Sequence, residues 1–456
     1  MAGTFSSFSA ALSGLQYNRT AMDVASSNIA NASSTGYARR QVVAQSTGAP
    51  ATPAIWSRWQ GAGDGVEAGR ITRLVDPLLD SRSRAEHASA SFLDLRSTSL
   101  STLETSLAEP GDSGVAAALS GYQAAWHDVA NNPADLAARS QLLARAQTLR
   151  DTIATQGTAV GNEWAGQRNR LDAGVAEVNQ VASQLADLNR GLRASAVAGT
   201  DAGTLLDQRD VLTARLAELT GAAVTVNADT TVEVSVGGQS LVSGYTATAM
   251  TVTGASDIAA AASDPVVVSV GGAPVTLAAG SVGAGQQLLA TDLPTYLSAL
   301  DDVVAALTST TNAQHAAGLD LDGAAGGDLW TGTTAATLQV AITDPRKVAA
   351  AAASRGGLDS SNADLLANLD SGAGSYRNLV TAFAVTVTSA RQGAGNQAAL
   401  VAQIDASRES LSGVSTDEEM VNLLTAQRGY EACARVLTAL DSMLDTLIHS
   451  TGMVGR

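Results

Sequence analysis

The segment Asp417–Ile448, DEEMVNLLTAQRGYEACARVLTALDSMLDTLI, has a heptad pattern that predicts one long amphipathic helix. Its narrow stripe consists of Met420, Leu423, Gln427, Tyr430, Ala434, Leu437, Leu444 and Leu447, and Leu424, Leu440 and Ile448 widen it. Thr416, followed three residues later by Glu419, predicts a capping box at the start of this helix.

The other end of the chain repeats the pattern. A first helix of about four heptads is predicted by Phe5, Phe8, Leu12, Leu15, Met22 and Ile29. Two narrow-striped helices at opposite ends of one chain are expected to pair. Because the pair alone would leave apolar surface exposed, other copies of the chain could complete the packing. An ordinary antiparallel pair within a monomer is the alternative that the pattern leaves open.

The first helix is expected to end in the polar run Ser26–Gln41, SSNIANASSTGYARRQ. Asparagine, serine and threonine side chains hydrogen-bond their own backbone, and Gly36 tolerates a positive φ, so the run predicts a helix end and a turn. Two arginines follow the turn. Arg39 and Arg40 could pair with acidic groups of a neighbouring subunit or remain solvated in a loop.

Composition restricts the classes of function. The net charge of −16 and the pI near 4.6 argue against nucleic acid or an anionic membrane as a partner, because phosphates would be repelled. The single cysteine, Cys433, cannot form an internal disulfide. No apolar window is long enough to span a bilayer, and the first residues lack a cleavable signal, so any export is expected to need no signal cleavage.

Between the two ends, the pattern predicts a helical body with an inserted β region. Helices are expected at residues 92–107, 115–126 and 135–219, with breaks at Pro110 and near residues 196–203. From Ala222 to about Leu277 the period changes to two, and two Val-Gly-Gly sequences predict hairpin turns. Helices are expected to resume at about Leu293, and the β region is expected at the tip of the molecule.

The sequence contains no recognisable catalytic constellation, so no catalytic residues, cofactor or metal are expected and the protein is predicted not to be an enzyme. Its four histidines, His87, His127, His315 and His449, lack metal-ligand spacing. A glycine-rich loop with Asp320, Asp322 and Asp328 could suggest calcium. It lacks the EF-hand pattern, and aspartates that cap turns are the preferred interpretation.

Several segments resemble the axial proteins of the bacterial flagellum. SNIANASSTGY and AQRGYEA are similar to the terminal elements of these proteins, and GYARRQ resembles the form found in the flagellar hook-associated protein 1 family. Further similar segments, in the family's order, are Gly63–Arg82, Leu205–Leu219, Thr311–Trp330, Val340–Ala351 and Gly413–Ile448. LDQRD and TDEEM are the most specific of these elements. The extra arginine in GYARRQ and a short middle region depart from the family pattern.

The resemblance implies a mainly α, elongated, multi-layer axial protein with a small inserted β region. We expect residues 1–45 with 415–456 to form a terminal coiled-coil layer. Residues 46–221 with 286–414 are expected to form a helical-bundle layer, and residues 222–285 a β-rich insertion.

The resemblance also implies a function. The protein would be a structural component of the hook–filament junction, joining hook to filament and permitting flagellin assembly. Implied partners are identical subunits in a ring, the hook protein, the third hook-associated protein and a cytoplasmic export chaperone at the C-terminal helix. Export through the flagellar type III apparatus would place the protein in the extracellular flagellum. A hook or distal rod protein, or a secreted coiled-coil adhesin, is the alternative.

Two groups of residues would carry this function. Subunit packing is predicted for Phe5, Phe8, Leu12, Leu15, Met22, Ile29, Met420, Leu423, Gln427, Tyr430, Leu437, Leu444 and Leu447. By resemblance, the junction motif, which fixes each subunit against its neighbours, consists of Asn28, Asn31, Gly36, Tyr37, Arg39, Arg40 and Gln41.

Overall fold

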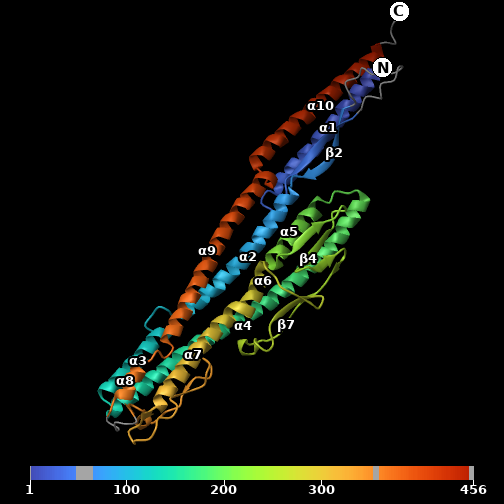
Figure 1. The fold of residues 1–456 in the computed structure, drawn as a ribbon. Coiled ribbons are helices and arrows are strands. Elements are labelled where there is room, and N and C mark those ends of the chain that lie inside the picture. The colour runs from blue at the N-terminus through green and yellow to red at the C-terminus, as the bar shows by residue number, and fades with distance from the viewer. Residues whose placement is uncertain (1, 48–64, 353–358, 451–456) are drawn as a thin grey trace, which may run out of the picture.

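The structure, a computed structural model, describes residues 2–47, 65–352 and 359–450. The molecule is elongated, and both ends of the chain lie together at one end of it (Figure 1). There α1 (Ala2–Ala30) and α10 (Thr416–Ser450) run antiparallel and pack against each other. The predicted pairing of the two terminal helices is therefore present within one chain.

The terminal helices meet through small side chains. The buried positions on α1 include Ala11, Gly14 and Ala25. Ala11 and Gly14 each lie one residue before a leucine of the predicted stripe. A Cβ at Gly14 would lie 2.9 Å from Sγ of Cys433, and one at Gly429 would lie 2.4 Å from Asn18. The paired face of α1 is thus turned by about 100° from the predicted one. The physical reason is that small residues let the two backbones approach closely.

A hairpin that the sequence analysis did not predict packs along α1. Its strands β1 (Arg40–Thr47) and β2 (Gly65–Arg73) are antiparallel, and Arg40 is paired with Arg73. At its other end, the backbone N–H of Val66 donates to Oγ of Ser13 on α1 at 3.2 Å. The hairpin therefore runs along α1 from Ser13, in the first half of the helix, to the point where α1 ends.

Eight α-helices within the described residues form the body. These are α2 (Pro77–Ser106), α3 (Val115–Asn131), α4 (Leu136–Ala198), α5 (Gly203–Thr220), α6 (Gly280–Gln287), α7 (Leu293–Ala316), α8 (Ser361–Ala367) and α9 (Ala373–Ser412). The predicted breaks near residues 110 and 199 are confirmed, and α4 ends at Gly199 in the left-handed conformation. Helices resume at Gly280, earlier than predicted, and a π-helical segment (Leu288–Asp292) leads into α7.

Large side chains fill the core of the body. Trp126, Trp164 and Trp330 are fully buried, together with leucines and valines from the long helices and the strands. Trp164 on α4 also donates from Nε1 to the carbonyl of Leu289 at 3.1 Å. This continuous core joins the helices to the β region.

The predicted β region forms two small antiparallel sheets. One contains β3 (Ala223–Val226), β4 (Val232–Val236), β5 (Gln239–Ser243) and β6 (Thr246–Ala247), and the other β7 (Met250–Thr253), β8 (Val267–Val270) and β9 (Ala273–Val275). The two predicted glycine turns are confirmed, with φ of 56° and 82° at Gly237 and Gly238, and of 59° and 83° at Gly271 and Gly272.

The predicted position of the β region is wrong. Its sheets lie along the side of α4 (Figure 1), because two asparagines of α4 bind the backbone of β4 and β7 and the strands share the apolar core of the helix. Asn189 exchanges hydrogen bonds with the backbone of Val232, and Asn179 does so with Met250. The tip consists instead of α3, α8 and the short strands β10 (Gly318–Leu319), β11 (Trp330–Thr331), β12 (Gln339–Val340) and β13 (Ala351–Ala352).

Candidate functional site at the joint between terminal helices and body

Four segments meet where the terminal helix pair joins the body. They are the end of α1 with the turn that follows it, the end of β2, the first turns of α5 and the first turn of α10. We call this meeting point the layer joint and define it by Asn28, Tyr37, Arg39, Arg40, Arg73, Asp207, Asp210 and Glu419. It unites the GYARRQ, LDQRD and TDEEM elements.

Asn28 lies at the centre of the layer joint and is fully buried. Its Nδ2 donates to the carbonyl of Arg40 and to Oε2 of Glu419, both at 2.9 Å. Its Oδ1 accepts from the hydroxyl of Tyr37 at 2.8 Å and from the backbone N–H of Arg40 at 3.1 Å. These bonds use the full capacity of one amide side chain. Asn28 therefore binds the end of α1 to the returning chain and to α10.

The predicted capping box between Thr416 and Glu419 is not formed. The hydroxyl of Ser415 accepts the N–H of Glu418 at 3.4 Å, and Thr416 is already the first helical residue. The Glu419 carboxylate instead accepts from Asn28 and from Nε of Arg39, the latter at 2.8 Å. Because its side chain is only 3% exposed, this ion pair is little screened by water.

Arg39 and Arg40 pair with acidic groups of their own chain, so neither is a solvated loop arginine, and a contact with a neighbouring subunit stays a prediction. Arg39 binds Glu419 and, through Nη1 at 2.9 Å, the exposed Glu418. Nη2 of Arg40 lies 2.8 Å from Oδ2 of Asp207, and its guanidinium lies 5.1 Å from the ring centre of Tyr37. The two arginines thus point to two different elements, α10 and α5.

Arg73 completes the joint from the other strand of the hairpin. Its Nη2 lies 2.8 Å from Asp207 and 2.7 Å from Asp210, both on α5. Because Arg73 and Arg40 are paired in the hairpin, both guanidinium groups reach the carboxylate of Asp207. LDQRD is among the most specific elements of the sequence, but its pattern predicts no role for Asp207 or Asp210, and none is predicted for Arg73. The available signal for this contact was that Arg40 and Arg73 each adjoin a segment with β-strand propensity.

The turn of the predicted junction motif packs directly on α5. Gly36 has a φ of +80°, as predicted for this turn, and an added Cβ would lie 2.2 Å from Cγ2 of Val211. Asn31 donates from Nδ2 to the carbonyl of Ser27 at the end of α1. Gln41 lies exposed in β1.

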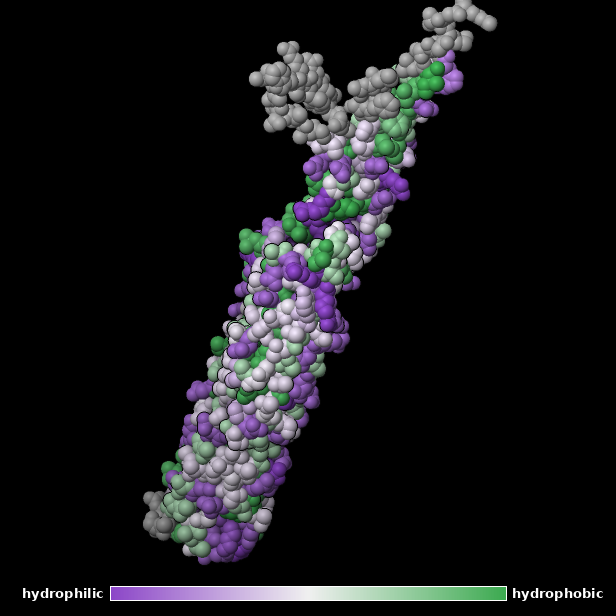
Figure 2. Space-filling view, turned by 90° about the vertical axis from the view of Figure 1, so that its right-hand side faces the viewer, coloured by the Kyte–Doolittle hydropathy of each residue, from purple (hydrophilic) through white to green (hydrophobic). Residues whose placement is uncertain are grey.

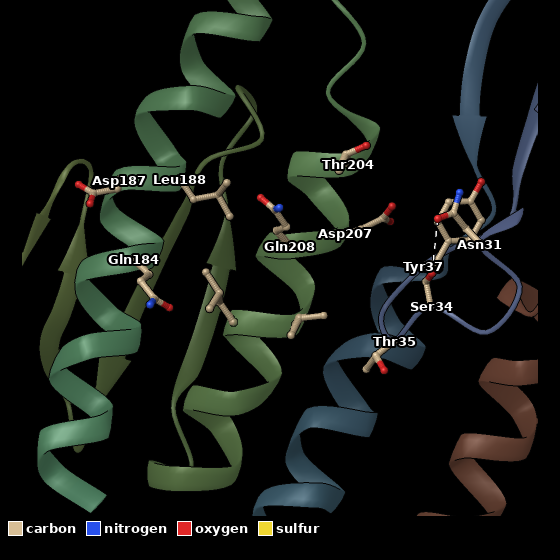
Figure 3. A pocket seen from close by; sticks show the side chains of 12 residues that line it. Asn31, Ser34, Thr35, Tyr37, Gln184, Asp187, Leu188, Thr204, Asp207 and Gln208 are labelled. Carbon is tan, nitrogen blue, oxygen red and sulfur yellow. Dashed lines mark hydrogen bonds between the residues drawn. The ribbon is translucent and has the colours of Figure 1, made fainter. Parts of the chain in front are cut away.

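An open groove of about 680 Å³ adjoins this turn (Figure 3). Its walls come from α4, from α5 and from the turn after α1. In Figure 3 the side chains of Gln184 and Leu188 line the α4 wall, whereas Asp207 points from α5 towards Tyr37. The carboxylate of Asp207 is bound by arginines, so this groove offers no free acid at that wall.

The predicted packing residues divide into two sets. Phe8 and Leu12 are each 41% exposed and Met420 is 53% exposed, and Gln427 is also exposed. Leu15, Met22, Ile29, Leu423, Tyr430, Leu437 and Leu444 are half-buried. The side chains of Phe5 and Leu447 lie outside the part that the structure describes. Figure 2 shows strongly hydrophobic surface on the terminal helices, whereas hydrophilic, neutral and hydrophobic residues are mixed over the visible face of the body.

The aspartate loop in the tip supports the turn interpretation. Oδ1 of Asp320 accepts the N–H groups of Asp322 and Ala324 at 2.9 Å, and Gly323 has a φ of +75°. Arg346 and Lys347 neutralise the loop and hold the pKa of Asp322 below its ordinary value. In the described ranges, no group of three or more His, Cys, Asp or Glu is placed to hold a metal ion.

The fold and the layer joint define an axial structural protein of the bacterial flagellum. A family model described as the flagellar hook-associated protein FlgK helical domain matches residues 100–330, just over half of the chain. Models described as flagella basal body rod protein and flagellar basal body rod FlgEFG protein C-terminal match residues 8–37 and 406–449. The chain belongs to the flagellar hook-associated protein FlgK family, and its role is structural, at the hook–filament junction.

Individual relatives agree with this assignment. The chain is 27% identical to flagellar hook-associated protein 1 of Bacillus subtilis, with both chains fully covered. It is 24% identical to flagellar hook-associated protein 1 of Escherichia coli, over 96% of this chain and 98% of that one. The solved structure of the flagellar hook junction protein FlgK from Burkholderia pseudomallei aligns with a TM-score of 0.65 at 16% identity. The alignment covers 73% of this chain and all of that structure.

Proposed function

We propose that this chain is one subunit of a short ring that joins hook to filament and permits flagellin to assemble. The observation that carries the proposal is the apolar surface left on α1 and α10 after they have paired, which includes Phe8, Leu12 and Met420. Contiguous exposed apolar surface is typical of an interaction site, and identical subunits in a closed ring bury it repeatedly. In this proposal the predicted stripes pack between subunits, and the small-residue face packs within each subunit.

The layer joint has a mechanical role in this proposal. The bonds of Asn28, Arg39 and Arg40 cross from α1 and the hairpin to α10 and α5. A joint of this kind fixes the direction of the terminal pair relative to the body. The junction residues therefore act within a subunit, and they position the face that contacts the next subunit.

The domain division also remains a proposal. Residues 1–45 with 415–456 would form the terminal layer, 46–221 with 286–414 the bundle layer and 222–285 the insertion. The β1–β2 hairpin, which packs on α1, places residues 65–73 beside the terminal layer.

Named partners extend the proposal beyond the general association with other axial components. We propose the hook protein on one side of the ring, the third hook-associated protein on the other, and a cytoplasmic export chaperone at α10. A lone helix with a narrow apolar stripe is only marginally stable in water, so α10 would need such protection before assembly. Export would follow the flagellar type III route to the extracellular flagellum. Within the described ranges, none of the helices is apolar enough over a sufficient length to cross a membrane.

Deletion of the gene tests the proposal. Electron microscopy of the deleted cells is expected to show bare hooks, and flagellin should accumulate as monomer in the medium. Restoring the wild-type gene should restore filaments. Absence of hooks would instead assign the protein to the hook or rod, and normal filaments would overturn a flagellar role at the junction.

A further inference from the structure

The tip of the molecule contains a buried histidine whose two ring nitrogens are both engaged. His315 lies in the last turn of α7. Its Nε2 lies 2.8 Å from the backbone nitrogen of Ala349, and its Nδ1 lies 2.6 Å from the carbonyl of Gly327. Because a backbone N–H can only donate and a carbonyl can only accept, Nε2 is the acceptor and Nδ1 carries the hydrogen. The ring is therefore neutral, and it ties two loops to α7.

The groups that surround His315 come from several elements. From α3, the ring of Trp126 packs edge-on at 6.3 Å, and from α8 the uncharged Asn362 donates to the carbonyl of Ala349. From α4, the buried guanidinium of Arg139 donates to the carbonyls of Pro133 and Val348, and among the described residues its Nη2 has no hydrogen-bond partner.

The loops around the ring carry further charges. Asp320 and Asp328 lie in the loop after α7, and Arg346 and Lys347 lie in the second loop, where they pair with Asp320 and Asp322. Burial lowers the pKa of His315. The Gly327 carbonyl opposes this effect, Arg139 adds to it, and the two aspartates oppose it.

We infer that His315 forms an acid-sensitive contact. Its neutral ring holds residues 318–327 and 345–351 to α7, and these residues are released when the ring takes up a proton. A proton on Nε2 turns the acceptor of the Ala349 N–H into a donor, so this hydrogen bond is lost. The proton also adds a positive charge near the Arg139 guanidinium, whose hydrogen bonds go to the uncharged carbonyls of Pro133 and Val348. This inference does not depend on the role of the protein in the flagellum.

The sign of the pH effect follows from the direction of the shift. The folded tip binds the proton more weakly than the opened tip does, so the stability from neutral His315 is present above the ordinary histidine pKa of about 6.5. It is lost as the pH falls from that value towards the lowered pKa of the folded state. For one proton, the opening equilibrium rises by up to about tenfold for each pH unit in this window.

Native-state hydrogen exchange of the full chain tests the inference. Between pH 7 and pH 5.5, after correction for the intrinsic exchange rate, opening at the Ala349 amide should increase by up to about eightfold, the limit for one proton and an open-state pKa of about 6.5. His315→Gln cannot be protonated and should abolish this pH dependence. His127→Gln changes an exposed histidine in the same tip, on α3, and should retain it. Opening that does not depend on pH in the wild-type protein would overturn the inference.

A second measurement on the wild-type protein applies even if His315→Gln does not fold. The chain has four histidines, so ¹⁵N signals of the imidazole rings can be assigned individually. His315 should show a neutral ring with hydrogen on Nδ1, and it should gain a proton only together with loss of the native tip signals. A proton taken up near pH 6.5 without any change in the tip would overturn the inference.

Discussion

The body and the terminal helix pair bury different kinds of side chain. The body fully buries Trp126, Trp164 and Trp330, whereas the buried positions on the described parts of α1 and α10 are alanine, glycine, Asn28 and Glu419. Burial of apolar area contributes about 25 cal/mol per Å². The body therefore has an apolar core of its own, and the terminal pair is held within the subunit by close backbone contact and by the layer joint.

This difference is consistent with a chain that folds stably and keeps apolar surface for the proposed assembly. If the large apolar side chains of α1 and α10 filled the intramolecular interface, little would remain for another subunit. The small residues reserve part of that surface, and the polar groups of the layer joint compensate for the reduced apolar burial. The predictions below test this division, from the largest expected change in the free energy of unfolding to the smallest.

Trp164→Ala in α4 should have the largest effect. The substitution removes a fully buried ring and its hydrogen bond to Leu289, which should lower the free energy of unfolding of the body by about 3–5 kcal/mol. Urea unfolding followed by far-UV circular dichroism measures this. The control Val385→Ala changes an exposed residue on α9 and should stay within about 0.5 kcal/mol. Equal effects of the two changes would contradict the role of the body core.

Glu419→Ala should have an intermediate effect that is confined to the terminal pair. Asn28 and Arg39 would lose their charged partner, which should lower the free energy of local opening by about 2 kcal/mol. Hydrogen exchange in α1 and α10 should accelerate by about 30-fold, with little change in α4.

The neighbouring Glu418 provides a matched control for this change. It pairs with the same arginine, but its side chain is 64% exposed, so Glu418→Ala should cost less than about 0.5 kcal/mol. If Glu418→Ala and Glu419→Ala lowered the free energy of local opening equally, burial of Glu419 would not explain the stability of the layer joint.

Local rules predicted much of this fold, and contacts between distant segments explain what they missed. The helix breaks at residues 110 and 199 and the glycine hairpins follow from the backbone preferences of a few adjacent residues. The Asn28–Glu419 bond joins positions 391 residues apart, and no local pattern specifies it. The same holds for the paired face of α1, since both possible faces carry heptad spacing and only the shape of α10 selects between them. Glu419 was wrongly predicted as a cap because its sequence position fits that motif equally well.

Leu12→Asp should have the smallest effect on the isolated subunit and a large effect on assembly. Leu12 is 41% exposed, so the free energy of unfolding of the subunit should change by no more than about 0.5 kcal/mol. In the proposed ring, the new carboxylate would be buried in an apolar contact between subunits, and an unpaired buried charge is strongly unfavourable. Cells that carry this variant should release flagellin and show bare hooks.

Val385→Asp is the control for Leu12→Asp, because Val385 is also exposed but lies on α9 of the body. It should leave both subunit stability and filament growth unchanged. Normal filaments with Leu12→Asp would show that this face of α1 is not an interface. A loss of subunit stability as large as that of Glu419→Ala would show that Leu12 belongs to the internal packing of the pair. Only a stable subunit that fails to assemble would support the division between the internal and the external face of the terminal helices.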